Sequence, residues 1–228
     1  MATCLYSACQ NEEASPNEIP DQNKVLVNIA VDNGENDQET KSVISQAENA
    51  IADITLFFFL DGKLTESIYT VPETDGTITI ESTKGYDSDA NVDVYGLVNM
   101  GDKRSLISAG GAVSTLKSWQ YTLASMADIN TSGFPMAGIE ENAPVGTAFT
   151  LTVHRLVAKY GFQINTSGLK YGTFTVTGLK LKNAAKTVTP FTEGSKVTSA
   201  SSVMDGDYAT TANVTTLKNG GGVYFYTL

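Results

Sequence analysis

Long hydrophobic runs, cysteine and histidine are what this sequence has least of. No apolar run approaches the roughly 18 to 20 residues that a membrane-spanning helix needs. Cysteine occurs only at Cys4 and Cys9, so no disulfide can staple the body of the fold. These two cysteines and the single histidine, His154, cannot form a structural zinc site without carboxylates. We therefore expect no metal and no cofactor.

Catalytic motifs are also scarce. A Ser-His-acid hydrolase would have to use His154, which lies in the strand-like segment TVHRLVAK, and no Gly-x-Ser-x-Gly turn occurs. The segment SAGGAV lacks the Lys-Ser/Thr ending of a phosphate-binding loop. DSDANVD, residues 87–93, starts like a calcium loop but lacks its glycine at position six and its glutamate at position twelve. An enzyme is the least supported class, and we predict that the protein is not one.

Length and charge limit the remaining classes. The 228 residues suffice for one large or two small domains, and 41% hydrophobic with 18% charged residues is typical of a folded chain. Fifteen Lys and Arg against 25 Asp and Glu give a net charge of -10. Such a charge argues against nucleic acid or an anionic membrane surface as the main partner.

The segment LYSACQNEE raises the question of what Cys9 does. One interpretation is an unreacted thiol in a frayed terminus. The other is lipidation, because small residues before a cysteine suit a signal peptidase and the new N-terminal cysteine then carries acyl groups. The eight residues before Cys9 are too few for a signal peptide, so we expect the true start to lie upstream. Residues 10–23, polar and containing proline, read as a flexible tether.

Beyond the tether the sequence alternates as β-strands do. In VLVNIAV the apolar residues Val25, Val27, Ile29 and Val31 share one face. IADITLFFFL is a longer run ended by the turn signal Asp61-Gly62. Because Phe57 and Phe59 share one face of that strand and Phe58 lies on the other, one face or both must be buried. Further strands are expected in SIYTV, TITIE, VDVYGLVN, TAFTLTVHRLVAKYGFQI and TFTVTGLKLKN.

One segment has helical spacing. In AVSTLKSWQYTLASMAD the residues Leu116, Trp119, Leu123 and Met126 recur every three or four positions, which predicts a helix with Trp119 facing the core. Many short strands separated by Gly, Asn and Asp turns favour a β-sandwich. A polar connection, DNGENDQETKSVISQAEN, separates the first two strands, and connections of this length are usually functional or mobile.

Several motifs together resemble the fimbrillin family, the type V pilus subunits and related surface lipoproteins of Bacteroidales. They are a Cys followed by QNEE, the aromatic strand ADITLFFFLDGKL, FPMAG (Phe134 to Gly138) and LTVHRLVAKYGFQI. FTVTGLKLKNAAKTVTPF and GGGVYFYTL resemble parts of the family's second β-domain. The resemblance covers most of the chain, with FPMAG and HRLVAK as its most specific parts.

The resemblance implies a mostly β chain: a transthyretin-like sandwich of the fimbrillin type with one short helix, then an incomplete second β-domain. It divides the chain into a lipoprotein signal remnant (1–9), the tether (10–23), an N-terminal sandwich (24–168) and the start of a truncated C-terminal domain (169–228). It implies a surface lipoprotein of the outer membrane that serves in a fimbrium, in contact with other pilus subunits and with host or bacterial surface ligands.

Family members polymerise by strand exchange after a protease cuts the loop that follows the first strand in the sequence, usually after an arginine. Here Lys24 to Val31 would be the displaced strand. The connection behind it has no arginine and offers only Lys41, because the two arginines are Arg104 and Arg155. This departure favours an accessory or anchor subunit over a shaft subunit. On its strand Arg155 shares a face with Val153, so its guanidinium must find an acidic or carbonyl partner or reach the surface.

Two other classes stay open. A carbohydrate-binding surface lipoprotein would need exposed Trp and Tyr side chains on one face, whereas the only tryptophan, Trp119, fits the helical stripe. A lipid-anchored esterase or protease would need a catalytic constellation, and the sequence shows none.

Overall fold

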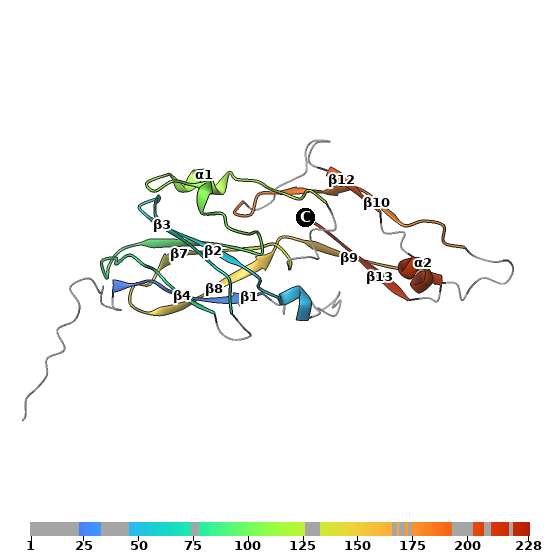
Figure 1. Cartoon of the computed structure of the whole chain (residues 1–228), viewed down its shortest axis with the longest axis horizontal. Coiled ribbons are helices and arrows are strands. Elements are labelled where there is room, and N and C mark those ends of the chain that lie inside the picture. The colour runs from blue at the N-terminus through green and yellow to red at the C-terminus, as the bar shows by residue number, and fades with distance from the viewer. Residues whose placement is uncertain are drawn as a thin grey trace, which may run out of the picture.

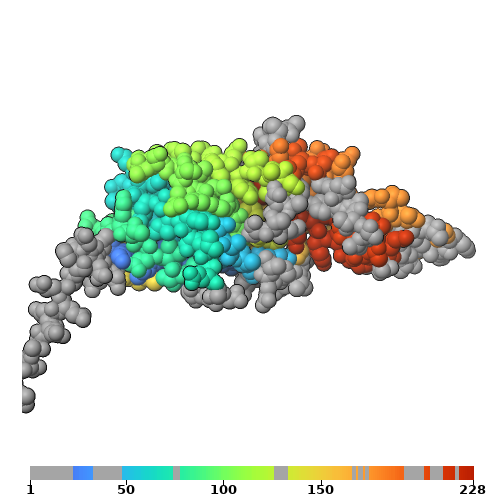
Figure 2. All heavy atoms as spheres, viewed as in Figure 1, coloured from blue at the N-terminus to red at the C-terminus, as the bar shows by residue number. Residues whose placement is uncertain are grey.

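The computed structural model describes residues 23–32, 46–73, 78–125, 133–165, 168, 172, 175–192, 203–207, 211–218 and 221–228. The described chain is mostly β, which confirms the predicted fold class. Figure 1 shows a broad N-terminal region, described between residues 23 and 155, and a narrower C-terminal region that begins at residue 158. Figure 2 shows the C-terminal atoms, in orange and red, gathered at one end of an elongated molecule.

Seven strands form the sheet of the N-terminal region, in the order β3-β2-β5-β7-β8-β1-β4. Their bounds are β1 (Leu26–Val31), β2 (Ile54–Leu60), β3 (Lys63–Thr70), β4 (Thr79–Glu81), β5 (Val92–Val98), β7 (Met136–Ala143) and β8 (Ala148–Arg155). The remaining strands are β6 (Tyr121–Thr122), β9 (Ala158–Gln163), β10 (Lys180–Ala185), β11 (Thr187–Val188), β12 (Val203–Asp207) and β13 (Gly222–Thr227). The helices are η2 (Gln46–Asn49), η3 (Arg104–Leu106), α1 (Val113–Lys117) and α2 (Thr211–Lys218).

The seven-stranded sheet folds over on itself where β7 meets β8. These strands pair over two positions only, Met136 with Arg155 and Ala137 with His154. Beyond that point they diverge, so β3-β2-β5-β7 forms one layer and β8-β1-β4 the other. Gly138 lies at this corner, where a Cβ would sit 2.4 Å from the carbonyl oxygen of Thr152. The glycine of FPMAG is therefore required for the close approach of two backbones.

Strand β2 is buried on both faces, which explains why its sequence does not alternate. Leu56 and Phe58 point into the core between the two layers. Phe57 and Phe59 point the other way into a second core, which is covered by Leu116 of α1 and by Phe191. The rings of Phe59 and Tyr95 meet edge to face at 5.4 Å in this second core. The predicted burial of the phenylalanine run is confirmed for both faces.

The predicted helix is wrong beyond Lys117. Helix α1 spans only Val113–Lys117, and the chain then enters β6, which pairs with β11. Leu123 continues this pairing, since its N–H donates to the carbonyl of Lys186 at 2.8 Å. A partner strand thus replaced the helical hydrogen bonds, a tertiary override of a local pattern. Trp119 nevertheless packs against the second core, whereas Met126 lies outside the described residues.

The C-terminal region consists of two-stranded ladders. β9 pairs with β13 and β10 pairs with β12, both antiparallel. Helix α2 places the buried Leu217 against Val223 and Phe225 of β13. The long strand expected over TAFTLTVHRLVAKYGFQI is split into β8 and β9, and β9 pairs with a C-terminal strand although it precedes the expected boundary at 168. The boundary itself stays a prediction.

Candidate functional site: the seat of strand β1

Strand β1 lies between two neighbours that run in opposite directions relative to it. It pairs in parallel with β8, from Leu26 opposite Ala148 to Val31 opposite Val153. It pairs antiparallel with β4 over three positions, centred on Val27 opposite Ile80. One strand therefore provides the pairing for two backbone edges, and its removal would leave both edges open.

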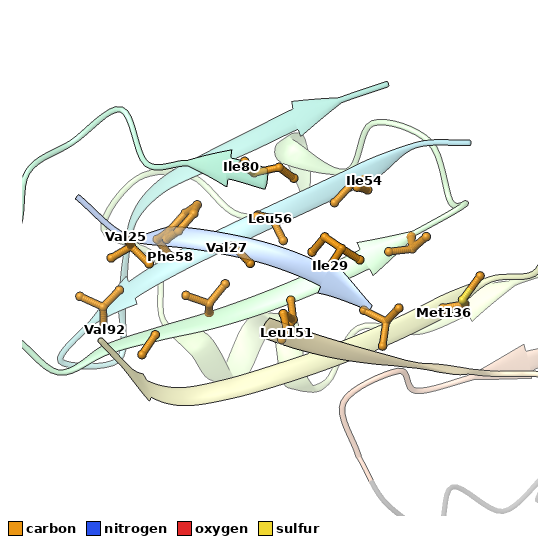
Figure 3. Packing of buried hydrophobic residues seen from close by; sticks show 14 of the residues in the cluster. Val25, Val27, Ile29, Ile54, Leu56, Phe58, Ile80, Val92, Met136 and Leu151 are labelled. Atoms are coloured by element: carbon orange, nitrogen blue, oxygen red, sulfur yellow. The ribbon is translucent and has the colours of Figure 1, made fainter. Parts of the chain in front are cut away.

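The apolar residues of β1 alternate into the main core, as predicted. Val25 and Val27 are completely buried, Ile29 is 9% exposed, and Val31 packs partly buried against the same cluster. Figure 3 shows Val25, just before β1, and Val27 and Ile29 of β1 projecting among Leu56, Phe58 and Leu151 of the surrounding strands. This row of side chains fills a long apolar slot between the two layers. At about 1.5–3 kcal/mol per buried aliphatic side chain, it contributes several kcal/mol to holding β1 in place.

The start of the strand is held by backbone and hydroxyl contacts. The N–H of Val25 donates to the hydroxyl of Ser82 at 3.0 Å, and the N–H of Ser82 returns a bond to the carbonyl of Val25 at 2.9 Å. The Ser82 hydroxyl itself donates to the carbonyl of Lys84 at 2.8 Å. The carbonyl of Lys24 accepts from the N–H of Gly146 at 2.7 Å. These contacts fix the register of β1 at its N-terminal end.

A polar cluster holds the other end of β1. The carbonyl of Asp32 accepts from Nη1 of Arg155 at 2.9 Å, and Nε of Arg155 donates to the carbonyl of Glu48 at 3.2 Å. Nη2 of Arg155 donates to Oδ1 of Asn49. The carboxylate of Asp32 also pairs with Nδ1 of His154 at 2.9 Å. The expectation that Arg155 finds carbonyl partners is confirmed, and His154 is an exposed, hydrogen-bonded strand histidine.

The cluster continues into the C-terminal region through Glu48, which is only 7% exposed. Its Oε1 accepts from Nζ of Lys159 at 2.9 Å and from the hydroxyl of Tyr226 at 3.1 Å. Burial opposes the charged form of Lys159, but the hydrogen bond to Glu48 and the attraction of Tyr226 and Glu48 together outweigh it and raise the pKa of this lysine. Burial, followed by the hydrogen bond to Glu48, raises the pKa of the Tyr226 hydroxyl. Both groups are protonated at neutral pH even without these shifts, which extend the protonated range to higher pH.

The remaining predicted site residues are not brought to this seat. Cys9 and Lys41 lie outside the described residues. Within the described ranges no group of three or more His, Cys, Asp and Glu side chains is placed to hold a metal ion. No helix in those ranges is both long and apolar enough to cross a membrane.

Sequence reasoning missed Glu48, Asn49 and Tyr226 at the seat. Glu48 and Asn49 belong to η2 (Gln46–Asn49), inside a connection whose sequence shows only its polarity. Tyr226 lies in the last strand, far away in sequence. The one available signal was the number of donors on Arg155, since a half-buried guanidinium requires several acceptors.

The comparisons with known proteins concern this fold. No protein-family model matches the sequence, and no curated protein matches it. Among solved structures, the chain resembles a fimbrial assembly protein from Parabacteroides distasonis, with a TM-score of 0.58 at 13% identity over 90% of this chain and 77% of that one.

Two further solved structures resemble this chain. One is a fimbrilin from Porphyromonas gingivalis, with a TM-score of 0.53 at 14% identity over 90% of this chain and 66% of that one. The other was crystallised as a candidate polysaccharide-binding protein from Bacteroides thetaiotaomicron, with a TM-score of 0.51 at 13% identity over 90% of this chain and 70% of that one. The chain thus has the β-sandwich fold of fimbrial and adhesion proteins. The sequence resemblance to the fimbrillin type is confirmed at the level of the fold.

Proposed function

We propose that this protein is a non-enzymatic, cell-surface fimbrial protein, either a subunit or an accessory or anchor protein, that assembles by exchange of strand β1 and has a role in adhesion. The observation that supports this function best is the seat of β1. A single strand fills an apolar slot and pairs with two edges, so its replacement by a strand of another subunit restores both apolar burial and backbone pairing.

The proposed exchange begins with a cut at Lys41, the only lysine or arginine between Asp32 and Gln46. Cutting there removes the covalent link to β2 but leaves the strand hydrogen-bonded in place. Its departure then requires a competing strand, because leaving the slot empty costs several kcal/mol of apolar burial. Exchange is expected to be slow and nearly balanced in contacts.

Limited trypsin digestion of the folded protein tests this step. Mass spectrometry should find the first cut at Lys41, and size-exclusion chromatography should then show multimers whose chains begin at Ser42. A nicked protein that stays monomeric would favour an accessory or anchor role. Protection of Lys41 while sites within the sandwich are cut first would refute the mechanism.

We further propose that Cys9 is acylated and fastens the protein to the outer membrane through the tether of residues 10–23. In cells that carry the complete gene, Cys9→Ala should abolish labelling with a palmitate analogue and release the protein from the membrane. Cys4→Ala is the matched control and should leave both unchanged. Label that persists on the Cys9→Ala protein would contradict this anchor.

A carbohydrate-binding surface lipoprotein is the second candidate function. Two observations favour it: the fold is shared with a candidate polysaccharide-binding protein, and β9 exposes Tyr160 (51%) and Phe162 (44%) on one face. Such rings can stack on sugars. Binding to a glycan array that is lost in Tyr160→Ala would favour this candidate. If the protein binds no glycan, only the fimbrial proposal remains.

A further inference from the structure

One guanidinium group connects the two chain segments that flank the proposed cut. Arg155 lies at the end of β8 and donates to Asp32, the residue after β1, and to Glu48 and Asn49 of η2. The covalent connection of residues 33–45 is therefore paralleled by a non-covalent one. A cut anywhere in that connection leaves both of its flanks bonded to the same side chain.

Asp32 has further contacts to β8 besides this one. Its N–H donates to the carbonyl of Val153 at 2.9 Å, and its carboxylate pairs with His154 at 2.9 Å. The His154–Asp32 pair is exposed, with 63% and 43% of the side chains accessible, so solvent weakens it. The half-buried Arg155 bond to the carbonyl of Asp32 is better shielded and is the stronger candidate for retaining the strand.

We propose that Arg155 is a clasp, a positioning residue that retains β1 in its seat after the chain is cut and so sets the rate at which the strand is released. This inference rests on the proposed function, in which β1 leaves, and adds the regulation of that step. Without the Arg155 guanidinium, its acceptors on Asp32, Glu48 and Asn49 would all lose its hydrogen bonds at once, and the end of β1 would open far more often.

The clasp is supported from the C-terminal region. The carbonyl of Glu48 accepts from Arg155, while its carboxylate accepts from Lys159 of β9 and Tyr226 of β13. These bonds hold η2 in position and thereby present two of the acceptors to Arg155. The C-terminal ladder thus contributes to retaining a strand of the N-terminal sheet.

An arginine is needed for this role because its acceptors lie in different directions. Nε, Nη1 and Nη2 each donate to a different residue, which the planar fork of a guanidinium permits. A lysine has one nitrogen on a flexible stem and cannot reach three separate acceptors in this geometry. Arg155→Lys therefore keeps the charge and the apolar stem but loses the bridge.

Hydrogen–deuterium exchange of the intact chain tests the clasp without any cut. Peptides covering residues 25–32 should exchange at least about tenfold faster in Arg155→Gln, the change that corresponds to about 1.4 kcal/mol of local opening. Peptides from β2 should be unaffected. Arg104→Gln is the matched control, because Arg104 is the only other arginine and forms its ion pair with the exposed Asp102.

Arg155→Lys provides a variant that keeps the fold if Arg155→Gln does not. It should also speed exchange of β1 but by less, since one of the bonds can be retained. Exchange of β1 at the parental rate in a folded Arg155 variant would overturn the clasp. So would an equal increase in β1, β2 and β5, which would mean a general loss of stability.

A second experiment separates failure of the clasp from failure of strand exchange. The trypsin-nicked protein is mixed with a fluorescent synthetic peptide of residues 23–32, and uptake is followed by anisotropy. Uptake at least about tenfold faster in Arg155→Gln than in the parent and Arg104→Gln supports the clasp. Uptake at one rate in all three overturns it. No uptake in any of them refutes the proposed strand exchange, and hydrogen exchange then decides the clasp alone.

Discussion

The N-terminal and C-terminal regions differ in how their strands obtain a core. In the N-terminal region, seven strands enclose one core between two layers and a second core on the outer face of β2 and β5. In the C-terminal region, two ladders of two strands each rest on small clusters, and one of these clusters includes Leu123 and Phe134 from the N-terminal region. Two-stranded ladders are marginal alone. The C-terminal region therefore depends on its neighbour for stability.

The largest expected effect comes from separating the regions. A fragment of residues 23–157 should fold cooperatively, with some loss of stability because Phe191 no longer meets the ring of Tyr95 at 5.2 Å. A fragment of residues 158–228 should be unfolded. Circular dichroism and thermal melting of both fragments are the measurements. Independent, cooperative folding of residues 158–228 would break the comparison.

Truncating one core ring in each region should show the same asymmetry. Phe58→Ala empties a fully buried position between the layers and should cost about 3–5 kcal/mol. Phe225→Ala, in the cluster under α2, should cost less because its small surroundings can collapse. Chemical denaturation measures both. Unchanged stability in Phe57→Ala and Phe58→Ala together would mean that β2 is not a core strand.

Glycine-to-alanine substitutions compare how closely the backbone is packed in the N-terminal and C-terminal regions. Gly138→Ala places a Cβ against the carbonyl of Thr152 at the corner of β7 and β8 and should cost about 1–3 kcal/mol. Gly178→Ala is the matched control in the C-terminal region, where nothing lies within 4 Å of the added carbon. Denaturation curves should separate the two variants clearly. Equal stability would mean that the corner relaxes without strain.

Alkaline pH should loosen the joint between the regions. The pKa values of Lys159 and Tyr226 are raised in the folded protein, so the folded state binds their protons more tightly than the unfolded chain does. Their contribution is complete below the unfolded values, near pH 10, and is lost as the pH rises through the folded ones. Tyr226→Phe should destabilise by about 0.5–1.5 kcal/mol at pH 8.

That deficit should shrink as the pH rises above about 10, because the tyrosine of the unfolded parent then ionises while the folded state still holds its proton. Denaturant midpoints of the parent and Tyr226→Phe at pH 8, 10 and 11.5 give the comparison. A deficit that grows with pH would contradict the assigned hydrogen bond to Glu48.

The smallest effect is expected on the exposed face of β9. Tyr160→Thr keeps a residue that suits a strand and removes a ring that is 51% exposed, so stability should change by no more than about 0.5 kcal/mol. Thermal melting checks this. A large loss would show that the ring is covered by another part of the protein in solution.

Local sequence patterns predicted those strands whose side chains alternate between a buried and an exposed face of one sheet. The alternation of Val25, Val27 and Ile29 placed β1 and its buried face, because a strand in one layer of a sandwich turns only one side to the core. The unbroken run of β2 predicted burial without naming what covers its second face. The helical stripe predicted the core-facing side of Trp119 but not the end of the helix at Lys117, because three-residue spacing also fits an irregular segment lying over an apolar sheet.

The seat of β1 was predictable only in part for the same reason. Its apolar row follows from the sequence, and so does the need of Arg155 for acceptors. The identity of those acceptors does not, because Asp32 and Asn49 lie 123 and 106 residues away along the chain. Local sequence carries no information on contacts at such separations until the sheet has closed.

By itself, the sequence determined the class of fold, the inward face of the first strand and the absence of disulfides in the body of the chain. Only the tertiary structure decided that β1 runs parallel to β8 and antiparallel to β4, and that Arg155 joins its end to η2. The physical reason is that the buried face of a strand follows from the order of neighbouring residues, because side chains alternate between its two faces with a period of two. Hydrogen-bond partners are instead chosen by where the folded backbone brings distant donors and acceptors together.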